Sequence, residues 1–394
     1  MAQGIYTDAH QSIRRNLRQF IEREVNPRRR ELEDAGQTPR DLWKRMGELG
    51  FLGPCYPEEY GGSGADFLTA CVITEELSRC AVSGFAMGFM VHAEMATPPI
   101  HFMGTDAQRR KWLAPAITGE MVFSLGISEP NAGSDVAAIR TTARRDGDHY
   151  VVSGSKCFIT NGTICDGVVL AVKTDPAAAP PHAGVSLLVV EKGAPGFKVG
   201  RKLEKIGCLA SDTSELFFED CRVPVANRLG GEGEGFVAIM RNFQRERLIA
   251  AVGFVAGAEE ALEMAIKYAR ERDAFGKPIH KHQSVRHLLV EMATETELVK
   301  TFVQDQCVKF SGSVNDAVAG GEGGEDLTKT ISMAKYRAAE LTEWITDRAL
   351  QIHGGWGYMK EFPISQAFLD ARAGSIAGGT TEIMKEIIGK YMGL

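Results

Sequence analysis

The stretch Ser-Glu-Pro-Asn-Ala-Gly-Ser-Asp-Val at residues 128–136 decides how this chain of 394 residues is interpreted. It follows an apolar run, 121–127, and precedes a hairpin-like region, so it predicts a tight turn after a strand. Pro130 cannot donate a ladder hydrogen bond, and Gly133 tolerates positive φ. Such a turn can aim several backbone donors at one anion. A connector without a ligand is the alternative for a turn of this kind taken alone.

A second candidate segment comes after a hairpin signal. Asp-Gly at 146–147 is typical of a two-residue hairpin turn, and a strand-like segment, 149–153, follows it. The next segment, 156–162, reads Lys-Cys-Phe-Ile-Thr-Asn-Gly. Phe158 could cover the face of a ring, and the Thr160 hydroxyl could hydrogen-bond a ring nitrogen. The two turns could therefore hold a flat ligand between them.

The composition indicates a large folded protein with no sign of a nucleic-acid partner. The chain is 44% hydrophobic and 24% charged, which is ample for two or three domains, and its net charge is −6. The eight cysteines show neither a Cys-x-x-Cys pair nor zinc-like spacing, and the pair His280 and His282 is interpreted as loop structure, so we assign no metal. No apolar run could span a membrane, and no signal peptide or clear transit peptide is recognised. We expect a bacterial-type cytoplasmic protein.

Residue patterns divide the chain into three parts. Residues 1–121 show helical periodicity, 122–234 are β-rich, and 235–394 are helical again. In the last part we expect long helices at 236–271, 284–310 and 327–352, with a flexible loop at 320–324. The predicted fold class is α+β, with three domains at these boundaries.

Five segments, in this order along the chain, resemble the acyl-CoA dehydrogenase family of FAD flavoenzymes. They are 128–136, 156–162, 272–277 (Arg-Asp-Ala-Phe-Gly-Lys, followed by His-Gln at 282–283), 351–358 (Gln-Ile-His-Gly-Gly-Trp-Gly-Tyr) and 376–383 (Ile-Ala-Gly-Gly-Thr-Thr-Glu-Ile). The resemblance runs from about residue 13 to 386. It implies a helical N-terminal domain, a β-barrel-like middle domain and a C-terminal four-helix bundle. It also implies FAD, a homotetramer, fatty-acid oxidation, and an electron-transferring flavoprotein as the electron acceptor.

The resemblance assigns cofactor contacts to three groups of residues. On its own subunit the flavin would be lined by Leu125, Gly126, Ile127, Ser128, Gly133, Ser134, Phe158, Ile159 and Thr160. The FAD of an adjacent subunit would be reached by Arg272, Phe275, Gln283, Gln351, Ile352, His353, Gly354 and Gly355. Thr380 and Glu382 match positions beside the adenosine and pyrophosphate. Phe158 stands where many relatives have tryptophan, and Cys208 where many have a basic residue. Without the resemblance, Arg272 would be interpreted as a surface charge paired with Glu271 or Asp273.

The catalytic base is the departure from the common family pattern. The chemistry needs a carboxylate to remove the α proton of the thioester while hydride leaves the β carbon for flavin N5. Much of the family has that glutamate at the position of Gly378. Glu246 is our candidate here, because it interrupts an apolar helical stripe and because the long-chain and isovaleryl branches place their base on this helix. The alternative is an exposed glutamate paired with Arg245 or Arg247.

Substrate contacts also follow from the resemblance. The acyl-CoA would meet Ser134, Phe243, Gln244, Arg247 and Gly378, and the Gly378 N–H would share the thioester oxygen with a ribityl hydroxyl of FAD. Glu129, by contrast, is expected to hold its own turn.

Small residues indicate a roomy acyl site. Ser83, Gly84, Ala86 and Gly88 lie on one predicted helix, and Ala377 stands where some relatives have tyrosine. Close helix packing would select small residues as well. We expect an acyl-CoA dehydrogenase for long or branched acyl chains. An oxidase on the same fold, or a flavin-binding protein without catalysis, remains an alternative.

Overall fold

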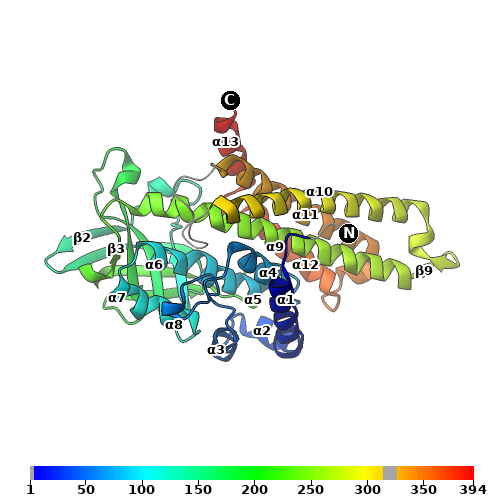
Figure 1. Ribbon diagram of the computed structural model, residues 1–394, viewed down its shortest axis with the longest axis horizontal. Coiled ribbons are helices and arrows are strands. Elements are labelled where there is room, and N and C mark those ends of the chain that lie inside the picture. The colour runs from blue at the N-terminus through cyan, green and yellow to red at the C-terminus, as the bar shows by residue number, and fades with distance from the viewer. Residues whose placement is uncertain (1–3, 314–325) are drawn as a thin grey trace.

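The computed structural model describes residues 4–313 and 326–394, and Figure 1 shows a helical N-terminal part, a sheet and a bundle of long helices. The loop expected at 320–324 lies outside the described residues. The helical, β, helical order confirms the predicted fold class. Within the described ranges, no helix combines the length and the apolar character that a membrane crossing requires.

The N-terminal part consists of short helices around a shared apolar core. Thr7 and His10 form a capping box that starts the first helix, and Asp66 caps the fourth. Trp43, Trp112 and Phe85 are fully buried between the helices. The helices are α1 (Asp8–Phe20), α2 (Arg29–Ala35), α3 (Arg40–Glu48), α4 (Phe67–Ser78), α5 (Ser83–Met90), α6 (Thr97–Met103), α7 (Asp106–Gln108) and α8 (Ala114–Ile117). π-helical turns at Ile21–Val25, Val91–Ala96 and Arg109–Leu113 continue α1, α5 and α7.

The middle part is a mixed sheet. The strands are β1 (Phe123–Gly126), β2 (Thr142–Asp146), β3 (His149–Thr160), β4 (Gly167–Lys173), β5 (Val185–Glu191), β6 (Phe197–Lys202), β7 (Thr213–Pro224) and β8 (Arg228–Leu229). Their order is β6-β7-β3-β2-β4-β5-β8, with β1 parallel to β4. In this sheet β6, β7, β3 and β2 form one half, β4, β5 and β8 form the other, and the two halves are joined where β2 pairs with β4. β2 and β4 pair only at Thr142 and Lys173. The predicted hairpin at 146–147 is confirmed, since Asp146 pairs with His149 around it.

Long helices form the C-terminal part and match the predicted ranges within a few residues. They are α9 (Gly235–Glu271), α10 (Gln283–Ser313), α11 (Thr328–His353), α12 (Pro363–Ala371) and α13 (Thr381–Tyr391), and a small hairpin of β9 (Asp273–Ala274) and β10 (Lys277–Pro278) joins α9 to α10. Buried alanines on α9 and α11 let these two helices pack closely. Figure 1 shows β9 at the end of the bundle that lies away from the sheet.

Candidate functional site

A buried ion pair builds the turn after β1. Glu129 accepts hydrogen bonds from the backbone N–H groups of Arg140 and Thr141 at 2.6 and 3.0 Å, and its carboxylate lies 2.8 Å from Lys156 Nζ. Lys156 also donates to the Ile127 carbonyl at 2.9 Å. Burial lowers the pKa of Lys156 to about 8. Burial alone would raise the pKa of Glu129, but the Lys156 charge and the hydrogen bonds lower it. The prediction that Glu129 holds this turn is confirmed.

The two turns predicted to hold a flat ligand lie together. The Cys157 N–H donates to the Ser128 carbonyl at 3.0 Å, which ties the segment 156–162 to the segment 128–136. Phe158 follows with its side chain 71% exposed and a φ of 60°, an uncommon conformation for a residue other than glycine. Backbone strain of this kind clusters at active sites and ligand sites. Thr160 is half-buried beside it.

The other residues predicted to line the flavin on its own subunit include both buried and exposed positions. Gly126 and Ile127 are buried at the end of β1, Leu125 and Ser128 are half-buried, Ile159 is buried, and Gly133 and Ser134 are exposed. A side chain at Gly126 would approach Leu170 and Val168 at 3.0 Å, so this glycine is also needed for packing.

Glu246 is buried, and the interpretation of this residue as an exposed surface charge is wrong. Its side chain is 4% exposed on α9, and the Asn242 side-chain amide donates to its carboxyl oxygen at 2.5 Å. Arg245 forms an ion pair with Glu94 at 2.6 Å. Burial raises the pKa of Glu246 to about 8, although Arg247 and the Asn242 hydrogen bond act in the opposite direction. A carboxyl group that titrates near neutral pH suits a general base.

Arg247 connects this part of α9 with the turn that contains Gly378. Its guanidinium lies over the Phe243 ring at 5.4 Å, and its side chain is 6% exposed. A side chain built at Gly379 would have its Cβ 3.9 Å from Arg247 Nε. That Nε atom has no hydrogen-bond partner within the described residues. A buried, unpaired guanidinium N–H is a candidate donor to a bound anion.

The turn itself has left-handed backbone at two successive glycines. Gly378 has φ of +66° and Gly379 of +92°. Thr380 then caps α13 by accepting from the Ile383 N–H at 3.2 Å, and Glu382 is exposed in the first turn of that helix. Gln244, on α9, donates to the hydroxyl of Thr328 at the start of α11 at 3.1 Å.

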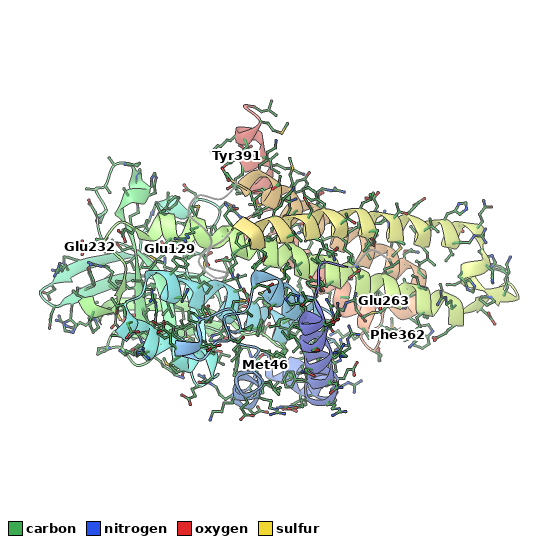
Figure 2. All side chains as sticks on the ribbon, in the orientation of Figure 1. Met46, Glu129, Glu232, Glu263, Phe362 and Tyr391 are labelled. Atoms are coloured by element: carbon green, nitrogen blue, oxygen red, sulfur yellow. The ribbon has the colours of Figure 1, made fainter. Side chains whose placement is uncertain are left out.

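A cavity of about 660 Å³ begins one turn beyond Glu246 on the same helix. Ala250 and Gly253, four and seven residues after Glu246, line it together with Phe254, Met87 and Met90. Charged side chains line its other part: Arg79, Glu260, Glu263, Lys267, Glu271 and Asp370. Figure 2 labels two lining residues, Glu263 and Phe362, toward the end of the bundle that lies away from the sheet and Glu129.

The small residues of α5 serve both of the expected purposes. Ser83 and Ala86 line the cavity. A side chain at Gly84 would instead meet the Ala210 and Ser211 backbone at 2.5 Å, and one at Gly88 would meet Asn161 at 3.0 Å. Two of the four residues therefore border the cavity, and the other two allow α5 to pack against neighbouring segments.

The structure does not bring all predicted cofactor residues together within one chain. Arg272, Phe275 and Gln283 are exposed around the β9–β10 hairpin, as are Gln351 in the last turn of α11 and Gly354 and Gly355 just after it. Figure 1 places β9 at the opposite end of the molecule from β2 and β3. Phe275 is 97% exposed with a φ of 52°. Arg272 forms no ion pair with Glu271 or Asp273 in the part of the chain that the structure describes.

Two further predicted positions near this hairpin are occupied by internal contacts. Ile352 is half-buried, and His353 is buried, stacks on Tyr268 at 4.3 Å and hydrogen-bonds the Ala349 carbonyl at 2.7 Å. His280 and His282 each hydrogen-bond a backbone carbonyl at 3.1 Å. No group of three possible metal-ligating side chains is found among residues 4–313 and 326–394.

Sequence reasoning missed Lys335. This residue of α11 is fully buried, and its ammonium donates to the carbonyls of Gly374 and Gly379 at 2.8 and 2.5 Å. The signal was present in the sequence, because Lys335 lies four residues after Ile331 and three before Ala338 on an apolar helical stripe.

Comparisons with known proteins agree with this architecture. The description "Acyl-CoA dehydrogenase, N-terminal domain" fits residues 7–120, the middle domain of that family fits 124–221, and its C-terminal domain fits 233–393. The mitochondrial long-chain specific acyl-CoA dehydrogenase of Sus scrofa is 39% identical over 386 residues, which are 98% of this chain and 87% of that protein.

Two solved structures extend the comparison. An acyl-CoA dehydrogenase complexed with FAD from Bacillus anthracis is 31% identical with a TM-score of 0.91, over 98% of this chain and 67% of that one. A structure described as the electron transferring flavoprotein of Acidaminococcus fermentans contains a chain that is 35% identical with a TM-score of 0.91, over 100% of this chain and 99% of that one. The chain belongs to the acyl-CoA dehydrogenase family of FAD-dependent oxidoreductases.

Proposed function

We propose that the chain dehydrogenates acyl-CoA thioesters to trans-2-enoyl-CoA and that Glu246 removes the α proton. The observation that carries this proposal is the buried carboxyl of Glu246, held by Asn242 at 2.5 Å, in a chain with glycine at position 378. In much of the family the base stands at that position. A buried carboxyl needs a functional or structural reason, and Glu246 makes no ion pair at hydrogen-bond distance within the described residues.

The residues around Glu246 suit a base whose strength depends on its surroundings. Burial raises the pKa of Glu246 to about 8, while Asn242 and Arg247 favour the ionised form. The group is therefore partly ionised near neutral pH, and its carboxylate is basic enough to accept a proton. Arg247 and the Gly378 N–H are the donors we assign to the substrate, and Phe243 and Gln244 lie on the same part of α9.

The chain's own turns fit the isoalloxazine and ribityl parts of FAD. Phe158 offers a ring face, Thr160 and Ser128 offer hydroxyls, and the exposed turn at 133–134 offers backbone donors. When bound, FAD supplies the acceptor for the hydride that leaves the β carbon. Thr380 and Glu382 at the start of α13, with the N-terminal amides of that helix, are assigned to the far part of the cofactor.

A second copy of the chain would complete the cofactor site. Arg272, Phe275 and Gln283 are exposed around the β9–β10 hairpin, which lies away from the sheet (Figure 1). Gln351, Gly354 and Gly355 are exposed as well, and His353 between them stacks on Tyr268 near the end of α9 that leads to this hairpin. Within one chain they have no route to a flavin at Phe158. We therefore infer a homo-oligomer, a tetramer by the family resemblance, in which this end of the bundle contacts a neighbour's FAD.

The cavity beyond Glu246 supports a long or branched acyl chain. Its volume of about 660 Å³ lies well inside the range of ligand pockets, about 300–1,000 Å³. The first part, at Ala250, Gly253 and Met90, is apolar, as an alkyl chain requires. Fatty-acid oxidation follows as the metabolic role. We assign an electron-transferring flavoprotein as the acceptor by the family resemblance; a chain similar to this one occurs in a structure described as an electron transferring flavoprotein.

The test is an anaerobic titration of the FAD-loaded protein with straight and branched acyl-CoAs of increasing length. Flavin absorbance should bleach rapidly with long or branched substrates. Glu246→Gln should retain FAD and bind acyl-CoA, but it should bleach at least about 100-fold more slowly, the usual contribution of a placed general base. Glu297→Gln, which removes one exposed carboxylate from α10, is the matched control.

The outcomes separate the competing functions. If no thioester bleaches the flavin of the FAD-loaded protein, the chain is a flavin-binding protein without this catalytic activity. Rapid reoxidation in air with stoichiometric hydrogen peroxide would identify an oxidase. Near wild-type bleaching by Glu246→Gln would show that another residue is the base.

A further inference from the structure

We propose that Lys335 is a positioning residue for this reaction: it holds the segment 374–379 so that the Gly378 N–H can meet the thioester oxygen. The inference rests on the proposed function, because it concerns how the oxyanion that forms after α-proton removal is stabilised. It adds a residue of α11 to a site otherwise built from α9, the β-sheet turns and the turn before α13.

The geometry around Lys335 links α11 to both ends of this segment. Its ammonium donates to the Gly374 carbonyl at 2.8 Å and to the Gly379 carbonyl at 2.5 Å. Its side chain is 0% exposed, and no carboxylate lies within ion-pair distance of it among the described residues. A buried cation without a carboxylate is costly, whereas an uncharged side chain would pack here without that cost. The charge therefore needs a reason beyond packing.

The turn that Lys335 holds has backbone donors to offer at Gly378 and Gly379, because neither N–H donates to any described residue. Ile376 and Ala377 donate their N–H groups to the Ala373 carbonyl at 3.1 and 2.9 Å. The Gly378 N–H makes no hydrogen bond with any described residue. Gly378 and Gly379 both have left-handed backbone, which glycine adopts without strain but which leaves the turn free to move unless other groups fix it. Lys335 fixes it through the two flanking carbonyls.

Two buried cations flank this turn. A Cβ at Gly378 would lie 3.9 Å from Lys335 Cε, and one at Gly379 would lie 3.9 Å from Arg247 Nε. Burial, and after it the nearby Arg247 charge, lower the pKa of Lys335 to about 8, while the Glu343 charge acts in the opposite direction. Glu246 is the acidic neighbour of Arg247 on α9. Fixed positive charge beside a backbone donor is the arrangement that stabilises a developing oxyanion.

Lys335→Met tests the proposal, since it keeps the length of the side chain and removes its charge and its donors. We expect FAD content to stay at the wild-type level and KM for a long acyl-CoA to change less than about 3-fold. We expect kcat to fall about 10- to 100-fold, the range for a misplaced or missing oxyanion donor.

A second readout does not depend on turnover. Acetoacetyl-CoA has an acidic α proton, and its bound enolate can be followed by ultraviolet absorbance as pH rises. In Lys335→Met the pH at which half of the bound ligand is enolate should rise by about one unit or more, because the enolate loses its positioned donor. A purely structural role of Lys335 would not move this midpoint in protein that retains FAD.

Ser332→Ala is the matched control. Ser332 is buried on α11 three residues before Lys335, and among the residues that the structure describes its hydroxyl bonds only within its own helix, to the Thr328 carbonyl at 2.7 Å. It should keep wild-type kcat and the wild-type enolate midpoint. If Lys335→Met does not fold, Lys335→Gln, which keeps an N–H donor without charge, takes its place with the same enolate criterion.

Two results would overturn the proposal. One is a wild-type kcat and enolate midpoint in the Lys335 variant. The other is a loss of activity in the Lys335 variant that is fully accounted for by a proportional loss of bound FAD or of folded protein. Failure of the proposed function would be recognised separately, because wild-type protein would then not bleach with any acyl-CoA.

Discussion

Replacing Glu246 by glutamine should make the protein more stable while it removes most of the activity. Glutamine has the shape of glutamate, can still accept the Asn242 hydrogen bond at the same carbonyl position, and has no charge to desolvate. Because burial raises the pKa of Glu246 to about 8 from the usual 4.5, the folded protein holds a proton at this site that the unfolded chain releases. The wild-type protein is therefore destabilised as pH rises from 4.5 towards 8.

The size of the effect follows from this shift. At pH 7 the unfolded carboxyl is ionised and the folded one is mostly protonated, which costs the wild-type protein 1.36 kcal/mol for each of the 2.5 pH units above 4.5. The product is about 3 kcal/mol. Glutamine has no such cost. Below pH 4.5 both proteins carry a neutral group here, and the difference in stability should vanish.

The assay is chemical unfolding of both proteins at pH 4.5, 7 and 8.5, followed by far-ultraviolet circular dichroism. Cofactor-free and FAD-loaded samples are compared, so that mass-action stabilisation by FAD is measured separately. Glu297→Gln controls for the loss of one surface charge. Equal stability of Glu246→Gln and wild type at pH 8.5, or a less stable variant, would refute the idea that Glu246 is a desolvated carboxyl.

Further predictions concern the base, the turn, the cavity and the second copy. Because the carboxylate fraction of Glu246 grows with pH up to about 8, kcat/KM should rise about 10-fold between pH 6 and pH 7, where Lys335 is still charged, and a flat profile there would exclude this base. Glu129→Gln leaves the Lys156 ammonium buried without its carboxylate, so the free energy of unfolding should fall by about 3–5 kcal/mol and FAD should be retained less well. An unchanged midpoint of urea unfolding would show that the ion pair is dispensable. Ala86→Leu reduces the cavity, so kcat/KM for long acyl-CoAs should fall about 10-fold or more while short ones change little, as steady-state kinetics with a chain-length series would show. Arg272→Ala should weaken FAD binding about 10- to 100-fold without changing the unfolding midpoint of cofactor-free protein, and equal FAD affinity by equilibrium dialysis would remove Arg272 from the cofactor site.

Hydrophobic periodicity and turn residues were enough to predict the fold, because the local preferences of the sequence agree with the helices and strands that the chain forms. The 37-residue helix α9 has no proline, and β4 and β5 are buried Val/Leu runs bounded by turn residues. The burial of Glu246 was also predictable, since it interrupts an apolar stripe. The burial of Lys335 had a signal in the sequence, its place on an apolar helical stripe, but its contacts did not, because its partners are backbone carbonyls about 40 residues away and backbone acceptors leave no mark in the sequence. The separation of the cofactor residues into two distant groups came from the resemblance rather than from any pattern in the chain.

The position of the base and the conformation of the turn at 378–379 are linked. A glutamate at position 378 would have to adopt a φ of +66°, which is strained for any side chain, with its Cβ 3.9 Å from Lys335 Cε. With glycine at position 378, the left-handed backbone causes little strain and the N–H stays available, but the turn supplies no proton acceptor. Glu246 on α9 can supply one because α9 is rigid and already packed against α11. In the proposed site, an acid on α9 leaves the turn with donors only, and the cations Arg247 and Lys335 supply the positive charge around it. A carboxylate restored at position 378 would reduce the positive charge that the enolate oxygen meets, even in a variant that still carries Glu246.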